Sequence, residues 1–361
     1  MEKPKVVYIL PFFDEDTDTH LFYNYELIKE VSKVLDIFVI IERAVGNPNK
    51  LGCKYQVQKF KNPIFRFLEL LFILKIMRLR GYKNFYTHYS YYGAFVSFFL
   101  TKIFGGNAFY WNRGMPWLFK RNWFEEKVLR FILKHTILAT SPESLALEYQ
   151  KIYGTKKYAI LSNWIDIERY KPTMSKEEAK KSLGLDNAKK HVLFVHHLSK
   201  RKGADLIVPV AERFGEDVVF VVAGDGPHSV EGDNIILLGK IPQSEVVKYF
   251  HASDIFFMPS REEGSPHVLL EAMASGVSFV ASDVGGVKEL VGETLLDFLC
   301  KSEDVDCFTE KIKTLLSDNE LYDKARAECL KRAENYDISL GVREFTNLFN
   351  NENNNISDKR S

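Results

Sequence analysis

The chain has 361 residues, of which 46% are hydrophobic and 27% are charged, and its formal net charge is +1. These values are ordinary for a folded globular protein with room for two cores, and they exclude a disordered or fibrous chain. No apolar run reaches the roughly 18 residues of a spanning helix. The short apolar run at the amino terminus, which ends at Pro11, is not that of a signal peptide.

Strand-like and helix-like segments alternate through the first half of the chain. Buried strands are expected at 5–10, 36–41, 84–89, 108–111 and 136–139. Helical spacing of the apolar residues predicts helices at 21–34, 64–80 and 94–104. Such alternation is typical of a parallel sheet covered by helices.

A break in the pattern near Lys171 and Pro172 separates a second series of the same kind. The run from Ser175 to Glu178 has the pattern of a capping box that opens a helix. Strands are then expected at 192–195, 218–223, 235–238, 255–258 and 279–281. The predicted organisation is therefore a first domain at 1–172, a second at 173–335, a final helix at 336–350 and a disordered tail at 351–361.

The small net charge hides an uneven distribution along the chain. Residues 1–172 carry 26 Lys and Arg against 16 Asp and Glu, whereas the remainder carries 23 against 32. The stretch 51–134 has 15 basic and 3 acidic side chains and is rich in Phe and Trp. One interpretation is docking to an anionic membrane or lipid. The alternative is a solvated basic face over an aromatic core. Nucleic acid is not expected as a partner, because no motif for it is present.

The four cysteines are Cys53, Cys300, Cys307 and Cys329. Their spacing fits neither a metal site nor a catalytic pair. We therefore expect free thiols in a reducing compartment, such as the cytoplasm.

Two glutamates, Glu263 and Glu271, are separated by seven residues. The first precedes a loop of Gly264, Ser265 and Pro266, and the second lies on a predicted helix that begins near His267. Carboxylates can accept hydrogen bonds from hydroxyls, and the free N–H groups at a helix start suit a phosphate. This combination fits a nucleotide-sugar, although two solvated surface glutamates would give the same spacing.

This segment resembles the E-x7-E region of the retaining glycosyltransferases of family 4. Further segments resemble motifs of that family in the same order, at 137–144, 160–166, 194–203, 221–227, 238–242, 252–260 and 282–289. The resemblance implies an α/β protein of the GT-B fold, with two facing Rossmann-like domains, parallel sheets and a carboxyl-terminal helix that crosses back to the first domain. It implies transfer of a sugar from a nucleoside-diphosphate donor to a glycan or lipid-linked acceptor, with retention at the anomeric carbon.

The resemblance also assigns roles to residues. Lys202 and Glu263 are the catalytic candidates, since Lys202 would stabilise the departing diphosphate and Glu263 would hold sugar hydroxyls. Glu271 would bind the ribose. The other donor-binding candidates are His197, Lys240, Ile241, Gly264, Ser265, Pro266, His267, Val268 and Leu269. Neither a metal nor a cofactor is expected, because basic side chains and a helix start replace the metal of the Asp-x-Asp enzymes.

The sequence departs from the family at several places. His197 stands where the family has a phosphate-binding arginine, and a polar loop from Asp14 to His20 replaces a Gly-Gly loop. The acceptor-side candidates are His20, His88, Asn112 and Arg113. These departures keep two alternatives open. One is a non-catalytic relative that binds a nucleotide or glycan, and the other is a different GT-B enzyme such as a nucleotide-sugar epimerase.

Overall fold

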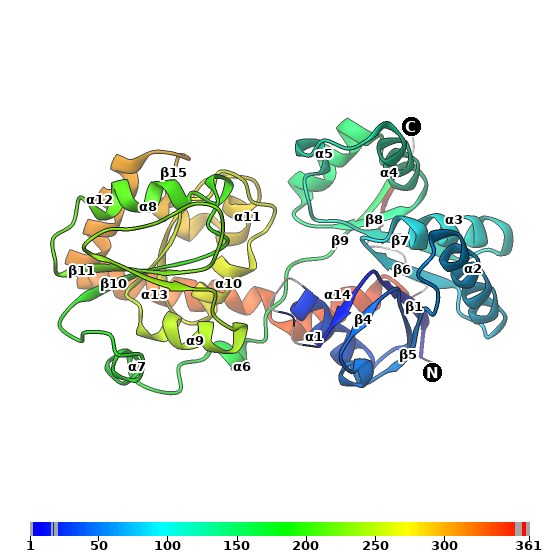
Figure 1. The fold of residues 1–361 in the computed structure, drawn as a ribbon, viewed down its shortest axis with the longest axis horizontal. Helices are drawn as coiled ribbons and strands as arrows, with labels where there is room; N and C mark the ends of the chain where they lie inside the picture. The colour runs from blue at the N-terminus through cyan, green and yellow to red at the C-terminus, as the bar shows by residue number, and fades with distance from the viewer. Residues whose placement is uncertain (1–2, 16, 18–20, 351–355, 359–361) are drawn as a thin grey trace. The chain divides into compact units, whose positions relative to one another are not determined.

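The computed structural model describes residues 3–15, 17, 21–350 and 356–358. The chain divides into two compact units. Unit 1 comprises Met1–Ser162 and Ser339–Ser361, and unit 2 comprises Asn163–Ile338. Each unit is built around its own mainly parallel sheet with helices packed on it (Figure 1).

The unit 1 sheet has the strand order β16-β9-β8-β7-β6-β1-β3-β5. Its parallel strands are β1 (Lys5–Leu10), β3 (Asp36–Ile41), β5 (Lys54–Val57), β6 (Asn84–His88), β7 (Asn107–Trp111), β8 (Ile137–Thr140) and β9 (Lys157–Ile160). The five strands expected from the sequence are confirmed to within a residue at each end. β5 and β9 were not expected, because each has only four residues and a weak apolar pattern.

Alternating side chains of β1 pack on opposite faces of the unit 1 sheet. Val7 and Ile9 share a core with helices α2 (Pro63–Leu79) and α3 (Tyr91–Phe104). Tyr8 points the other way, and its ring lies 6.1 Å from that of Phe345 on α14 (Ile338–Asn347). The chain thus returns from unit 2 to close the second face of unit 1. The remaining helices of this unit are α1 (Leu21–Val31), α4 (Trp123–His135) and α5 (Glu143–Tyr153).

The boundary between the units lies earlier than the break expected near Lys171 and Pro172. Helix α6 (Ile167–Tyr170) already belongs to unit 2, because the fully buried Tyr170 lies in its core. The backbone carbonyl of Tyr170 is 2.8 Å from Nε2 of His251. The polar run that suggested a boundary is therefore a surface loop inside unit 2.

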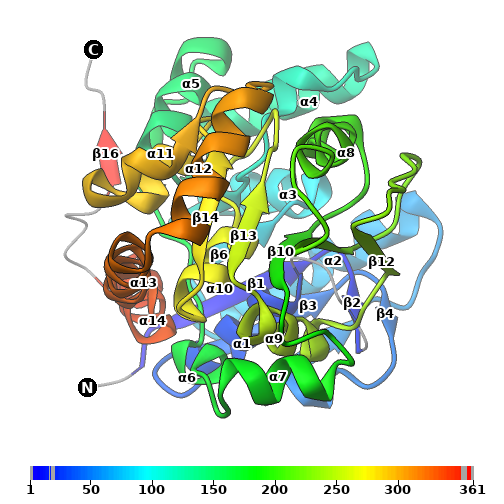
Figure 2. The ribbon, with the colours of Figure 1, turned by 90° about the vertical axis from the view of Figure 1, so that its left-hand side faces the viewer.

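The unit 2 sheet is parallel throughout, with the order β12-β11-β10-β13-β14-β15 (Figure 2). Its strands are β10 (Lys190–Val195), β11 (Val218–Ala223), β12 (Ile235–Gly239), β13 (Ile255–Met258), β14 (Ser278–Ser282) and β15 (Leu299–Cys300). The five expected strands are confirmed, and the two-residue β15 is additional.

Helices cover both sides of this sheet. Figure 1 shows α8 (Ile207–Ala211) and α12 (Val305–Ser317) on one side and α9 (Gln243–Ala252) on the other. The remaining helices are α7 (Lys176–Ser182), α10 (His267–Ala274), α11 (Val287–Val291) and α13 (Asn319–Ala333). The expected capping box opens α7, where Ser175 and Glu178 each accept a hydrogen bond from the other's backbone N–H.

The expectation of four free thiols is wrong for one pair. Cys300, at the end of β15, forms a disulfide with Cys307 in the first turn of α12. Their Cα atoms are 5.9 Å apart, within the usual range for a disulfide. The fold brings these two positions together, and their spacing in the sequence gives no indication of this. Cys53 and Cys329 are free, and burial raises the pKa of Cys53 to about 11.

The tail expected to be disordered includes one strand. β16 (Ile356–Asp358) pairs antiparallel with β9, so the expectation is wrong for these three residues. β9 is otherwise an edge strand, whose unpaired N–H and C=O groups favour such an addition. Residues 351–355 and 359–361 lie outside the described residues. Within the described ranges, no helix combines the length and apolarity needed to cross a bilayer.

Candidate functional site

The loops that follow β10 and β13 meet at one point of the unit 2 sheet. From β10 the chain moves outward to β11 and β12, and it then returns to β13 on the other side of β10. The carboxyl ends of two parallel strands where the order reverses are the usual ligand-binding place in such sheets. Lys202 lies on the first loop and Glu263 on the second.

Lys202 and Glu263 form a buried ion pair. Each is 5% exposed, and Lys202 Nζ lies 2.8 Å from Glu263 Oε1. Ser260 donates a second hydrogen bond of 2.7 Å to the same oxygen. Burial by itself would raise the pKa of Glu263, but the hydrogen bond from His196 and the Lys202 ammonium outweigh it and hold the pKa at about 2. Glu263 is therefore a carboxylate at every physiological pH.

His196 supplies the third contact to Glu263. The backbone N–H of His197 donates to His196 Nδ1 at 2.9 Å, so the ring proton sits on Nε2. That Nε2 lies 3.4 Å from Glu263 Oε1. Burial lowers the pKa of His196, which keeps the ring neutral in this tautomer. Oε2 of Glu263 accepts no hydrogen bond from any described residue and is left to receive one from a ligand.

His197 is not part of this cluster. Its side chain is 54% exposed, and its Nδ1 lies 3.9 Å from Asp225 Oδ1. The two neighbouring histidines thus point in different directions, as expected for consecutive residues at the end of a strand. The residue that reaches Glu263 is therefore His196, which is not among the site residues predicted from the sequence.

Two glycines allow the loops to approach so closely. Gly203 has φ of +72°, and a Cβ there would lie 2.1 Å from the carbonyl oxygen of Pro259. Gly285 has φ of +55°, and a Cβ there would lie 1.7 Å from the carbonyl oxygen of Glu263. Any other residue at either position would displace the backbone that carries the Lys202–Glu263 pair.

Helix α10 begins directly after this cluster. Its N-cap residue is Pro266, whose side chain forms no cap hydrogen bond with the first turn of the helix at His267, Val268 and Leu269. Asn163 fixes the preceding loop, since its Nδ2 lies 2.7 Å from the carbonyl oxygen of Ser265. The loop of Gly264, Ser265 and Pro266 connects Glu263 to the start of α10. The partial positive charge of that helix start therefore lies only a few residues along the chain from Glu263.

Glu271 lies on the buried side of α10. It is 3% exposed, and its Oε1 accepts a 2.9 Å hydrogen bond from Gln243 Nε2. Burial raises its pKa to about 8. Gln243 opens α9 directly after the candidates Lys240, which is exposed, and Ile241, which packs on the core. The loop expected to contact a base is thus joined to Glu271 through Gln243.

Three acceptor-side candidates come together in unit 1, at the carboxyl ends of β6 and β7. The ring of His88 stacks on that of Trp111 at 4.0 Å, and His88 is fully buried. Arg113 donates to the carbonyl oxygens of residues 161 and 162 at 2.6 and 2.8 Å, and burial lowers its pKa to about 10. Asn112 accepts from the N–H of Gly114 at 2.9 Å.

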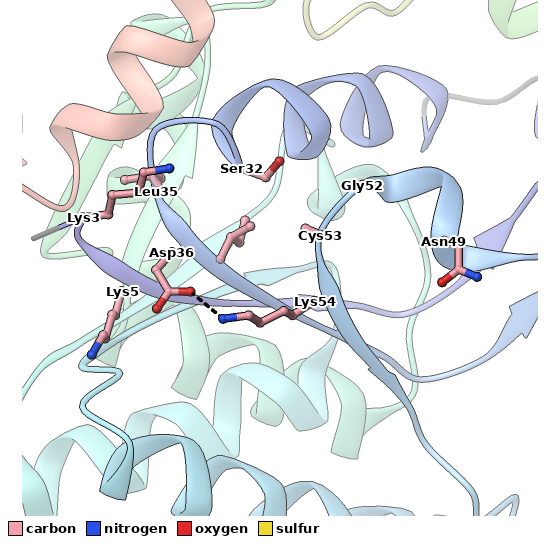
Figure 3. A pocket seen from close by; sticks show the side chains of 10 residues that line it. Lys3, Lys5, Ser32, Leu35, Asp36, Asn49, Gly52, Cys53 and Lys54 are labelled. Atoms are coloured by element: carbon pink, nitrogen blue, oxygen red, sulfur yellow. Dashed lines mark ion pairs between the residues drawn. The ribbon is translucent and has the colours of Figure 1, made fainter.

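Among the described residues, the structure gives no further candidate residue a place in a site. His20 lies outside the described residues. In the described part of the chain, no group of three or more His, Cys, Asp or Glu side chains is placed to hold a metal ion. A pocket of about 670 Å³ in unit 1 is lined by Lys3, Lys5, Asp36 and Lys54, among others (Figure 3). It lies at the amino ends of β1 and β3, the opposite edge of the sheet from His88, and contains no candidate residue.

Residues 175–335 match the family described as Glycosyl transferases group 1. The match places a group 1 glycosyltransferase domain in the second half of the chain. The matched region contains Lys202, Glu263, Glu271 and all of α10, so the cluster described above lies inside the family's domain.

Curated relatives of the chain include proteins named for lipopolysaccharide core biosynthesis and for teichuronic acid biosynthesis. The lipopolysaccharide core biosynthesis mannosyltransferase LpsB of Rhizobium meliloti is 29% identical, over 61% of this chain and 67% of its own length. The putative teichuronic acid biosynthesis glycosyltransferase TuaC of Bacillus subtilis is 32% identical, over 44% of this chain and 41% of its own. Alignments with further curated relatives span 35–66% of those relatives' own length.

Solved structures match over nearly the whole chain. A glycosyltransferase from Rickettsia africae gives a TM-score of 0.78 at 14% identity and covers 97% of this chain and 98% of its own. Sucrose-phosphate synthase from Thermosynechococcus elongatus gives 0.77 at 15% identity, with 96% and 98% covered. Anabaena HepE, in complex with UDP and glucose, gives 0.76 at 14% identity, with 95% and 98% covered. These likenesses confirm the GT-B fold predicted from the sequence.

Proposed function

We propose that this protein transfers a sugar from a nucleoside-diphosphate donor to a glycan or lipid-linked acceptor, with retention at the anomeric carbon. The observation that carries the proposal is the Lys202–Glu263 pair beside the start of α10, inside a group 1 glycosyltransferase domain. Lys202 and the helix start suit the diphosphate of such a donor, and the Glu263 carboxylate suits its sugar hydroxyls.

The donor diphosphate would lie against Lys202 and the N–H groups at His267 and Val268. As the bond from the anomeric carbon to the diphosphate oxygen breaks, negative charge grows on the diphosphate. A preorganised ammonium and helix start stabilise that charge, and the reaction needs no metal for this purpose. With retention, the acceptor oxygen bonds to the anomeric carbon on the face that the diphosphate leaves, and the proton of the acceptor hydroxyl passes to the departing diphosphate oxygen.

Glu263 would accept a hydrogen bond from a donor-sugar hydroxyl through Oε2, which has no partner among the described residues. Its other oxygen stays occupied by Lys202, Ser260 and His196, so the carboxylate is oriented before the donor arrives. Glu271 would accept hydrogen bonds from the ribose, and the backbone near Lys240 and Ile241 would contact the base. The half-exposed His197 would reach only the outer phosphate oxygens.

The acceptor would bind at the carboxyl edge of the unit 1 sheet, near Asn112 and Arg113. A lipid-linked acceptor is supported by a relative named UDP-Gal:alpha-D-GlcNAc-diphosphoundecaprenol alpha-1,3-galactosyltransferase of Escherichia coli, which is 28% identical over 46% of this chain. The protein would then work in the cytoplasm, on the inner face of a membrane.

A thermal-shift screen of UDP, GDP, ADP and their sugars tests the donor. A ligand at a hundredfold excess over its Kd stabilises the folded state by about 2.7 kcal/mol, which shifts the melting temperature measurably. Slow hydrolysis of the matching donor, followed by NMR, should first release the sugar as the anomer present in the donor. Binding without any turnover, with water or with acceptor, would favour the non-catalytic relative, and initial release of the opposite anomer would exclude retention.

A further inference from the structure

Helix α2 is apolar on both of its faces. Leu70, Ile73, Leu74 and Met77 point into the unit 1 core. A second stripe at helical spacing points away from the core and is exposed, with Ile64 70% exposed, Phe72 65% and Leu79 81%; Leu68 and Leu71 belong to the same stripe. A surface helix normally has a polar outer face, so this one is built to be covered.

The same surface continues over the neighbouring helices. α3 packs against both α2 and α4, and the Phe99 ring of α3 stacks at 6.0 Å on Phe131 of α4. We call this surface the outer face of α2–α4. Its exposed apolar side chains are Phe60, Ile64, Phe65, Leu68, Leu71, Phe72, Leu79, Tyr92, Phe99, Ile103, Phe104, Leu118, Phe119, Trp123 and Phe124.

The stretch of chain that contains this face is strongly positive. Residues 51–134 carry 15 basic and 3 acidic side chains, a balance of 15 − 3 = +12. Two of the three acids are engaged, since Glu69 accepts from the N–H groups of Lys59 and Phe60 and Glu126 pairs with Arg121. Hydrogen bonds from backbone N–H groups leave the charge of Glu69 in place, so Glu69 and Glu125 are the acids of this stretch that form no ion pair with a described Lys or Arg.

The lysines of the face are available to a partner. Lys75 on α2, Lys102 on α3 and Lys120 before α4 are exposed, and none of the three pairs with a carboxylate among the described residues. Lys127 lies over the Trp123 ring at 4.1 Å. Long basic side chains can lie along apolar groups and keep their charge at a polar boundary, where Trp is also favoured.

We infer that the outer face of α2–α4 docks on an anionic lipid bilayer, with its Phe, Leu, Ile and Trp side chains inserted at the interface and its lysines on the headgroups. Apolar insertion combined with positive charge is the pair of signals that gives stable but reversible membrane binding. A second copy of the chain fits less well, because a two-fold interface would bring this positive face against itself.

This inference rests on the membrane partner of the proposed function and names the surface that binds it. It does not depend on catalysis. Its readout is vesicle binding by the full chain, whereas the proposed function is read from donor binding. Failure of one is therefore visible without failure of the other.

Co-sedimentation with phosphatidylcholine vesicles, with and without phosphatidylglycerol, tests the surface. The wild-type chain should pellet with the anionic vesicles, bind less as salt is raised, and bind little to the neutral ones. The double variant Trp123→Ser with Phe124→Ser should lose most of this binding. The matched control, Ile236→Ser with Leu237→Ser, removes two exposed apolar side chains of unit 2 and should bind like the wild type.

A second pair of variants separates charge from apolar insertion. Each Lys or Arg near an anionic surface changes the partition coefficient roughly fivefold, so Lys75→Glu with Lys120→Glu should weaken binding by at least roughly 25-fold. The control Lys301→Glu with Lys324→Glu makes the same charge change on unit 2 and should have little effect. Equal binding of the two charge-reversal variants to anionic vesicles, or no pelleting of the wild type with them, overturns the inference. A dimer in solution that Trp123→Ser with Phe124→Ser dissociates would overturn it in favour of a second copy.

Discussion

Glu271 gives the protein a pH dependence that can be measured before any substrate is known. Burial on α10 raises its pKa to about 8 from an ordinary 4.5. Its one hydrogen-bond partner in the described chain is the neutral amide of Gln243, which does not compensate a buried charge. In the free protein at neutral pH, the carboxyl group is therefore largely protonated.

The sign of the effect on stability follows from proton binding. Between pH 4.5 and about 8 the folded protein holds a proton at Glu271 that the unfolded chain has released. The free energy of unfolding therefore falls as the pH rises through this window, and the full stabilisation is present only below pH 4.5. At about 1.36 kcal/mol per pKa unit, the shift corresponds to an upper estimate of roughly 4–5 kcal/mol across the window.

The variant Glu271→Gln isolates this contribution, because an amide has nearly the same shape and does not ionise. Urea denaturation at several pH values between 5 and 8 should show the variant gaining stability relative to the wild type as the pH rises. The exposed Glu320→Gln is the control and should follow the wild type. Parallel stability profiles for Glu271→Gln and the wild type would refute the assigned protonation state.

The same group should couple to nucleotide binding. If the ribose hydroxyls donate to a Glu271 carboxylate, binding must release the proton, and affinity for the nucleotide should increase as the pH approaches 8. Glu271→Gln should remove that dependence and weaken binding by roughly 1.5–3 kcal/mol, the range for a hydrogen bond to a charged group. Calorimetry in buffers of different ionisation enthalpy measures the proton release directly, and unchanged affinity in the folded variant would remove Glu271 from the site.

Three further predictions concern the chemistry of transfer. Lys202→Ala should lower kcat under saturating donor by roughly 100-fold or more, as for the loss of one group that stabilises developing charge; wild-type turnover would rule out its role on the diphosphate. Activity should survive EDTA, because Lys202 and the start of α10 take the charge, and loss that manganese restores would show that a metal does. His197→Arg should leave the protein active, since His197 is half exposed and points away from Glu263; complete inactivation would show that the histidine itself is required.

The sequence was sufficient to predict the residue types of the site but not the contacts between them. Glu263 and Lys202 stand in motifs whose order is visible in the chain, so both could be proposed as partners of a nucleotide-sugar. Ser260 and His196 lie within segments that resemble family motifs, but the sequence assigns neither a role, and Gln243 lies outside those segments. The two loops beside Gly203 and Gly285 bring Ser260 and His196 to Glu263, and Gln243 reaches Glu271 from α9.

For secondary structure too, the features that depend on neighbouring residues were predicted, and those that depend on distant residues were not. The long apolar strands β1 and β11 and the capping box at Ser175 are local signals, and they were predicted with nearly correct bounds. The disulfide between Cys300 and Cys307 and the pairing of β16 with β9 depend on how distant elements meet. Similarly, the apolar spacing of α2 predicted a helix, but that its second stripe is exposed is visible only in the folded unit.

The most direct test of the account is calorimetric binding of UDP, GDP and ADP to the wild-type chain and to Lys202→Ala, with circular dichroism to show that the variant is folded. The account predicts that at least one nucleoside diphosphate binds the wild type and that Lys202→Ala weakens it by roughly tenfold or more, because hydrogen bonds between charged groups contribute about 1.5–3 kcal/mol. Equal affinity for the two proteins, or no binding of any of the three nucleotides, would contradict the placement of a donor diphosphate at Lys202.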